Sequence, residues 1–185
     1  MKKTVIAILL AGLALVSCDS GKTPDQSGET NAATESVKVT ESEKTTETAV
    51  MNTAPYIVAF SDGKTVTLGA DPESTLPGLG EYFDMIEAPS CVHEGNDKVY
   101  SFNGFSVMTS PDVDGNEYVA QVDITLDVVS LANGITVGSA KADLVEAYGD
   151  SFTEQFGMLT YDFGNATLTA NLNGDVVAGI VFTAK

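Results

Sequence analysis

The sequence contains no arginine and no tryptophan, and its nine lysines face 26 acidic residues in a chain of 185, a formal net charge of −17. A nucleic-acid partner requires clustered cationic side chains, so this composition argues against one. One histidine, His93, and two cysteines, Cys18 and Cys91, are too few for a disulfide framework or for most metal and catalytic sites. We therefore expect no cofactor, no metal and no enzymatic activity.

The first 18 residues have the order of a secretory signal. Lys2 and Lys3 precede an apolar run over residues 5–16, which is too short to span a bilayer of roughly 30 Å. The following residues 15–18, LVSC, resemble the lipobox of bacterial lipoproteins. This resemblance implies that residues 1–17 are a cleaved signal peptide and that the nucleophilic thiol of Cys18 receives a diacylglyceryl group. An ordinary cleaved signal with a chance cysteine is the alternative.

A lipidated Cys18 would attach the chain to the outside of a cell membrane. Two acyl chains, at about 0.8 kcal/mol per buried CH₂, give stable anchoring. Residues 18–53 are rich in Ser, Thr and Glu and contain no aromatic residue. Such a segment buries too little apolar surface to offset its conformational entropy. We expect it to be a disordered, acidic tether between the membrane and a folded domain over residues 54–185.

The expected domain repeats a pattern along its length. Residues 66–69, VTLG, match residues 135–138, ITVG, and Gly80 then matches Gly149 at the same spacing. Later segments also match, with the turns DGN (114–116) and NGD (173–175) each preceding a strand pattern. We predict repeat 1 at about 64–127 and repeat 2 at about 133–185. Chance similarity between generic β patterns is the alternative.

Each repeat is predicted to begin with a small helical element. In the second, residues 139–148 have a helical apolar face, Ser139 is a candidate N-cap, and Gly149 suits the positive φ that follows a helix. In the first, Asp71 can cap and Pro72 suits the first helical position. The dipeptide at 77–78, Pro-Gly, limits this helix to one or two turns.

A meander of three or four antiparallel strands is expected after each helical element. The predicted fold class is therefore α+β, with two tandem helix-plus-meander repeats in two layers. One face of each meander packs against its helix and the other can face water. Strict alternation over 118–127 assigns to this second face, the candidate binding surface, Val119, Gln121, Asp123, Thr125 and Asp127.

Two segments carry a resemblance to known proteins. Residues 134–149, GITVGSAKADLVEAYG, resemble a motif of uncharacterised bacterial lipoproteins, and residues 87–91 and 95–100 resemble a second block of them. The repeat also resembles the β-lactamase-inhibitor-protein-like (BLIP-like) fold, in which helix-plus-antiparallel-sheet units occur in tandem. This resemblance implies the fold described above. It assigns no contact residue to this chain and does not imply inhibition.

Two short segments are candidates for chemistry. Cys91 and His93 could form a nucleophile and base, but no third orienting residue is evident, and we interpret Cys91 as a small, buried, inert residue. Residues 112–117, DVDGNE, suggest a calcium loop. An EF-hand requires Gly where Glu117 stands and Glu where Asp123 stands, so a tight hairpin turn is the preferred interpretation.

The sequence therefore predicts a non-enzymatic, lipid-anchored, extracytoplasmic binding protein. Its acidic surface favours a cationic protein or peptide as partner. A structural or chaperone-like component of a cell-envelope assembly is one alternative. A thiol or redox role of Cys91, which would be the only free thiol once Cys18 carries lipid, is another.

Overall fold

The computed structural model describes residues 55–185, so the expected signal peptide (1–17), Cys18 and the whole of the expected tether (18–53) lie outside the described residues. Ten strands, two α-helices and one 3-10 helix follow one another along this part of the chain. They are β1 (Ile57–Ala59), β2 (Thr65–Thr67), α1 (Pro72–Thr75), the 3-10 helix η1 (Leu76–Leu79), β3 (Asp84–Pro89), β4 (Asn96–Phe102), β5 (Phe105–Pro111), β6 (Glu117–Ile124), α2 (Lys141–Tyr148), β7 (Phe152–Gln155), β8 (Met158–Asp162), β9 (Ala166–Asn173) and β10 (Val176–Ala184).

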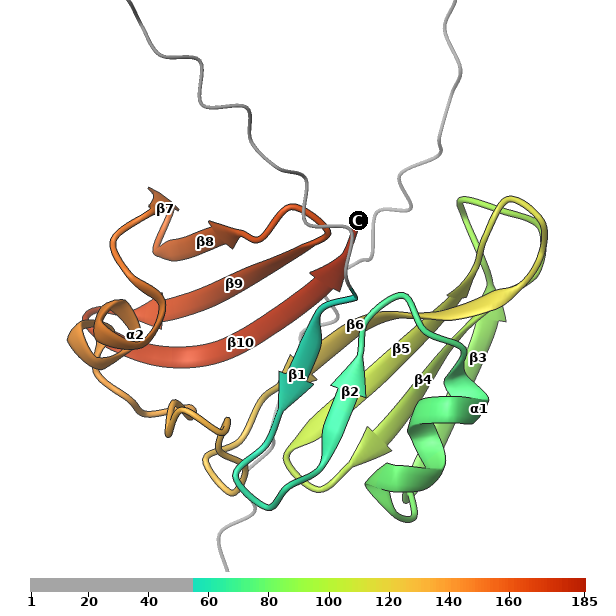
Figure 1. Ribbon diagram of the computed structural model, residues 1–185, viewed down its shortest axis with the longest axis horizontal. Coiled ribbons are helices and arrows are strands. Elements are labelled where there is room, and N and C mark those ends of the chain that lie inside the picture. The colour runs from blue at the N-terminus through green and yellow to red at the C-terminus, as the bar shows by residue number, and fades with distance from the viewer. Residues whose placement is uncertain (1–54) are drawn as a thin grey trace, which may run out of the picture. The chain divides into compact units, whose positions relative to one another are not determined.

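Eight of the strands form one antiparallel sheet in the order β3-β4-β5-β6-β10-β9-β8-β7 (Figure 1). Strands β3–β6 and β7–β10 are each joined in sequence order, and β6 pairs with β10 at the centre, with Ile124 opposite Ile180. Strands β1 and β2 form a separate hairpin. The sheet is therefore continuous from β3 at one edge to β7 at the other.

This architecture shows that the predicted α+β class, with two tandem helix-plus-meander repeats, is wrong. The described residues are mostly β, and helices α1 and α2 have only four and eight residues. The Pro-Gly dipeptide at 77–78 lies in η1, where helix α1 has already ended. In α2 only Leu144 is fully buried. Pairing of β6 with β10 merges the two meanders into one sheet instead of leaving two α+β units.

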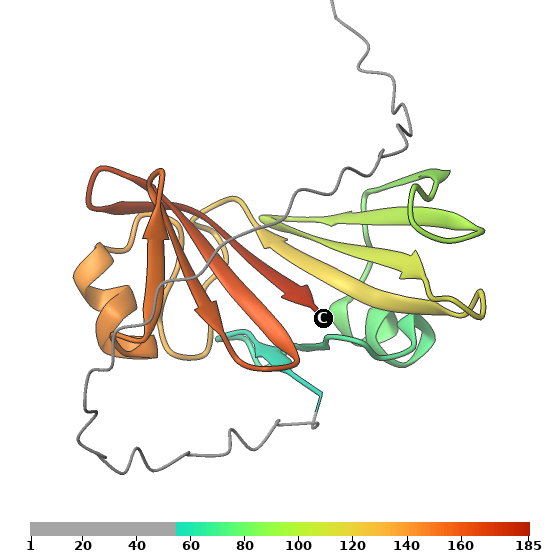
Figure 2. The same ribbon diagram turned by 90° about the horizontal axis from the view of Figure 1, so that it is seen from above.

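The hydrophobic core lies on one side of this sheet. Helices α1 and α2 and the β1–β2 hairpin all cover the same side, as Figure 2 shows. Their buried residues, such as Val58, Val66 and Leu144, form one cluster with the residues that the strands direct toward them. Fully buried members from the sheet are Val107, Val119, Val122, Ile124, Leu159, Tyr161, Ala166, Leu168, Ala170, Val177, Ile180 and Phe182.

The two halves of the sheet share one backbone contact pattern. The N–H of Gly69 donates to the Val119 carbonyl and that of Gly138 to the Val177 carbonyl, both at 2.8 Å. The N–H of Val119 and that of Val177 each donate back to the residue after the glycine, both at 2.9 Å. Both glycines have positive φ, 78° and 95°, which disfavours any other residue there. Each segment before a helix is thus hydrogen-bonded to the last strand of its meander.

The predicted alternation along β6 is wrong at one place, because the strand contains a β-bulge. Met108 lies opposite Gln121 but Thr109 lies opposite Val119, so Ala120 is an extra residue. Val119, which alternation assigned to the candidate binding surface, is therefore fully buried in the core. Residues 125–127 lie beyond the end of β6 and are exposed. An identical irregularity occurs in β10, where the register skips one residue between Val177 and Gly179.

Of the two predicted N-cap residues, one is confirmed and one is wrong. Asp71 is the N-cap of α1, and its carboxylate accepts from the N–H of Glu73 at 2.9 Å, as predicted. The prediction of Ser139 for α2 is wrong, because the N-cap is Ala140. The Ser139 hydroxyl oxygen instead accepts from the N–H of Thr136 at 3.0 Å. This bond stabilises the turn that precedes α2.

Candidate binding surface

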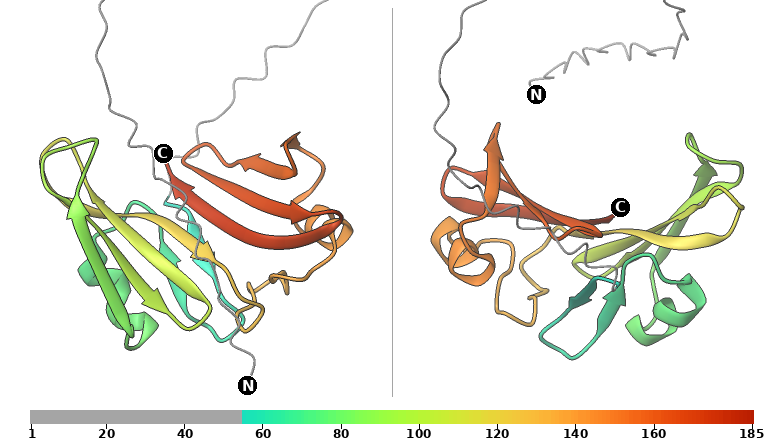
Figure 3. Two further views of the ribbon diagram at one scale, coloured as in Figure 1. Left: turned by 180° about the vertical axis from the view of Figure 1, so that it is seen from behind. Right: turned by 45° about the horizontal axis from the view of Figure 1, so that its top comes forward.

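No helix or hairpin of residues 55–185 covers the second side of the eight-stranded sheet (Figure 3). One row across it runs from Ser106 through Asp123, Val181 and Thr169 to Thr160. Figure 3 shows the two halves of the sheet inclined toward each other on this side, which makes it concave. We call this side the open face; its half-buried residues also include Ser101, Met108, Gln121, Thr167 and Thr183.

Short polar side chains dominate the open face. The Thr160 and Thr169 hydroxyls are 3.4 Å apart, and the Gln121 amide donates to the Asp123 carboxylate at 2.9 Å. Most aromatic rings pack in clusters on the covered side; for example, Phe102 stacks on Phe105 with 4.8 Å between ring centroids. The open face is therefore a platform of hydroxyls and small apolar groups around a central carboxylate. It presents acceptors rather than a hydrophobic patch.

All four lysines within residues 55–185 already form ion pairs with acidic side chains. The pairs are Lys64–Asp62, Lys98–Glu117, Lys141–Glu154 and Lys185–Asp162, with N–O distances of 2.5–2.7 Å. The same residues contain 19 acids, so most carboxylates have no lysine partner. The hydrogen bond from Lys185 lowers the pKa of Asp162, which therefore stays ionised. The described surface has excess negative charge and no unpaired lysine.

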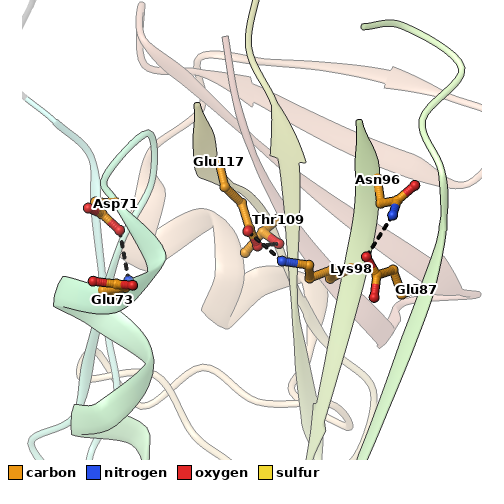
Figure 4. A network of polar contacts seen from close by, with 7 residues as sticks. All are labelled: Asp71, Glu73, Glu87, Asn96, Lys98, Thr109 and Glu117. Carbon is orange, nitrogen blue, oxygen red and sulfur yellow. Dashed lines mark hydrogen bonds and ion pairs between the residues drawn. The ribbon is translucent and has the colours of Figure 1, made fainter. Parts of the chain in front are cut away.

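A polar triad lies on the covered side of β4, β5 and β6 (Figure 4). Lys98 Nζ contacts Glu117 Oε2 at 2.6 Å, and Thr109 Oγ1 donates to Glu117 Oε1 at 2.5 Å. Thr109 is fully buried and the two charged groups are partly buried. The bond to Glu117 raises the pKa of Lys98 above its ordinary value. Every member is satisfied by another, so this triad is a structural contact and not a reactive group.

A cavity of about 290 Å³ opens at one end of the covered side. Phe60, Phe102 and Phe105 form its apolar lining, and Asp62 and Lys64 lie at its border. The two border charges are ion-paired with each other at 2.5 Å. Its lining also includes the polar residues Ser61, Glu81, Asn103 and Ser130, so the cavity combines apolar and polar surface.

The candidate residues for chemistry lie in two different connections, Cys91 and His93 between β3 and β4 and Asp112 between β5 and β6. Cys91 is an exposed free thiol between β3 and β4, so the interpretation of this residue as buried is wrong. His93 lies in the same connection, half-buried. Asp112 forms the predicted hairpin turn, since its Oδ1 accepts from the N–H groups of Asp114 and Asn116, both at 2.8 Å. These bonds occupy the Asp112 carboxylate, which is the first acidic group of the suggested calcium loop, and they lower its pKa.

The sequence placed Gln121 and Asp123 on the candidate binding surface, and the structure places them on the open face. It did not identify β3 as an edge strand bearing two acidic residues, Asp84 and Glu87. A signal for this was available, because charged residues within a strand pattern that ends in proline are typical of an edge. Here that proline is Pro89.

Residues 55–185 contain no group of three or more His, Cys, Asp or Glu side chains placed to hold a metal ion. No helix in this part of the chain is both long and apolar enough to cross a membrane. Cys18, the predicted lipidation site, lies outside the described residues. Comparisons with protein-family models, with curated proteins and with solved structures find no match to this chain.

Proposed function

We propose that this chain is a lipid-anchored binding protein that acts outside the cytoplasm and carries out no chemical reaction. In this proposal the open face of the sheet binds a cationic protein or peptide. Cys18 carries the lipid, as the lipobox resemblance of residues 15–18 implies. Two acyl chains hold the chain at the membrane while the folded domain meets its partner.

The observation that carries this proposal is the uncompensated Asp123 on the open face. Its carboxylate has one amide donor, from Gln121, and no lysine, because each of the four lysines in residues 55–185 pairs with another acid. Half-burial reduces solvent screening of this charge relative to a fully exposed one. A cationic side chain that reaches the open face would therefore pair with Asp123.

Ionic strength and a pair of matched variants test the open-face proposal. An oligolysine peptide and an oligoglutamate peptide of equal length are titrated against the full chain at rising salt. We expect only oligolysine to bind, with affinity that falls as salt screens the charges. Asp123→Asn should weaken binding by about 1 kcal/mol, roughly fivefold. Glu146→Gln, which removes an exposed charge from α2, serves as the control.

Two results would contradict the open-face proposal. One is binding of oligolysine that does not depend on salt. The other is an equal loss of affinity in Asp123→Asn and Glu146→Gln, which would mean that net charge alone attracts the peptide.

Fractionation of cells that express the full chain tests the anchor. The wild-type chain should partition with membranes, and Cys18→Ala should move it to the soluble fraction, because the thioether to the lipid requires the thiol. Cys91→Ser, which removes the exposed thiol of the folded domain, is the matched control and should leave partitioning unchanged. Membrane partitioning that survives Cys18→Ala would refute the anchor.

A further inference from the structure

Strand β3 is the outermost strand at one edge of the sheet. It pairs with β4 on one side, and within residues 55–185 no strand pairs with its other side. All six of its residues are exposed, including Met85 and Ile86, at 39% and 60% of full accessibility. An edge of this kind presents backbone donors and acceptors to any extended chain that approaches it.

The hydrogen-bond register identifies the groups that face outward. The N–H of Ser90 donates to the Gly95 carbonyl at 2.9 Å, and the pairing continues without a shift to Asp84 opposite Ser101. Backbone bonding alternates along an antiparallel strand. Asp84, Ile86 and Ala88 therefore bond to β4, whereas Met85, Glu87 and Pro89 direct their backbone groups outward. Proline has no N–H, so outward donors are confined to Met85 and Glu87.

Both acidic residues of β3 are without an ion pair among residues 55–185. Asp84 lies on the open face, opposite Ser101. Glu87 lies on the other side of the strand and accepts a 2.7 Å bond from the Asn96 amide (Figure 4). The opposite edge of the sheet differs, because Glu154 of β7 is bound by Lys141 at 2.7 and 2.8 Å. Uncompensated charge and outward backbone groups thus coincide at β3.

We propose that β3 binds an extended segment of the cationic partner by strand addition. This inference rests on the proposed function and adds where and how the partner docks. Strand addition combines main-chain hydrogen bonds with side chains that meet their cross-strand neighbours. The segment carries Lys or Arg opposite Asp84 and opposite Glu87, three positions apart, with two apolar residues between them opposite Met85 and Ile86.

Charge distinguishes this occupant from a second copy of the same chain. Residues 55–185 contain 19 acids and four lysines, so two copies repel each other. Edge-to-edge pairing of two β3 strands would add two Asp84 and two Glu87 side chains to one interface without a cation. A cationic segment supplies the missing charges instead.

Peptides with single backbone changes test the mode of binding without altering the protein. The probe is the capped peptide Thr-Lys-Val-Val-Lys-Thr, whose two lysines align with Asp84 and Glu87 in an antiparallel register. In that register the residue at position four faces Met85 and donates to it, whereas the N–H at position three points away. N-methylation at position four should weaken binding to the full chain by about tenfold, the effect of losing one well-placed hydrogen bond. N-methylation at position three is the matched control.

Charge exchange supplies a second readout. The double variant Asp84→Lys with Glu87→Lys should lose the lysine peptide and bind Thr-Glu-Val-Val-Glu-Thr, which the wild-type chain rejects. Equal effects of the two N-methyl groups, or failure of the charge exchange, would overturn strand addition at β3. If lysine-peptide binding then still depends on salt and on Asp123, the proposed function stands without it. Concentration-dependent dimerisation that Glu87→Pro abolishes, with no peptide binding, would show that a second copy occupies the edge.

Discussion

The two halves of the sheet differ in the side chains on their covered side, as a comparison of β4 and β5 with β8 and β9 shows. One cross-strand pair on the covered side of β4 and β5 is Lys98 and Thr109, and both bind Glu117. One covered-side pair of β8 and β9 is Leu159 and Ala170, and both are fully buried. A charged group stays within reach of water in the first half, whereas the second half excludes it.

This difference implies unequal local stability. Fewer buried apolar groups beneath a strand pair lower the free energy needed to open it. The β3–β6 half should therefore exchange its backbone amides faster than the β7–β10 half. The proposed docking strand, β3, lies in this less buried half.

The largest expected effect comes from the two helices. Leu144→Ala should lower the free energy of unfolding by about 2–5 kcal/mol, because Leu144 is the one fully buried side chain of α2. Thr75→Ala in α1 should cost only about 1 kcal/mol, since it removes one methyl and one hydroxyl from a smaller contact. Urea unfolding of both variants measures the difference. Equal losses would show that the two helices contribute alike.

The polar triad should give the next largest effect. Thr109→Val keeps the shape of a fully buried side chain but leaves Glu117 Oε1 without its donor, which should cost about 1–2 kcal/mol. Thr167→Val on the open face should change stability by less than about 0.5 kcal/mol. Both are measured by urea unfolding. A neutral Thr109→Val would mean that the two halves have equivalent cores.

Alkaline pH should destabilise both halves, through groups whose pKa is raised in the folded chain. Burial raises the pKa of Tyr148 to about 12 from an unfolded value of 10.0. Ionisation therefore favours the unfolded chain, so this contribution is complete below pH 10 and is lost as pH rises toward 12. In the first half the bond to Glu117 raises the pKa of Lys98, whose contribution is lost in the same direction.

Variants of Tyr148 and Glu117 separate the contributions at high pH. Unfolding free energy measured from pH 9 to 12 should fall less steeply in Tyr148→Phe than in wild type. Glu117→Gln should remove the part due to Lys98 and reduce that due to Tyr100, whose pKa is raised by burial and by the charge of Glu117. A wild-type slope in Tyr148→Phe would assign the alkaline loss to other groups.

The smallest expected effect concerns the hairpins at the two sheet edges. Phe156, in the turn between β7 and β8, has φ of 51° and is 96% exposed. Phe156→Asn should stabilise the chain by about 0.5–1 kcal/mol, because Asn tolerates this left-handed conformation and no packing is lost. The longer connection between β3 and β4 already has glycine, Gly95, at positive φ. Thermal unfolding detects the gain, and a lower midpoint would contradict it.

Local chemistry in the sequence predicted several turns correctly. Gly115 and Gly174 have the positive φ that their Asp-Gly and Asn-Gly settings indicate. Asp71 caps α1 because its carboxylate and the following Pro72 act within one turn of the chain. These features depend on neighbours in sequence, so composition and spacing suffice to predict them.

Longer-range features could not be obtained in this way. Alternation has a period of two, so one extra residue at Ala120 moved Val119 to the opposite side without a local signal. The fold class depended on Ile124 pairing with Ile180, a contact between strands that no turn connects. The sequence nevertheless placed Gln121 and Asp123 on the candidate surface, because they lie beyond the bulge where alternation resumes.

The position of β10 has a consequence for how the molecule is made. This strand follows all the others along residues 55–185, yet it lies between β6 and β9 at the centre of the sheet. Until its residues have left the ribosome, β6 and β9 each lack one neighbouring strand and expose one pairing edge. The eight-stranded sheet can therefore close only after β10, which follows every other strand of residues 55–185, has been made. Shortening the chain within Val176–Ala184 would leave two unjoined sheets.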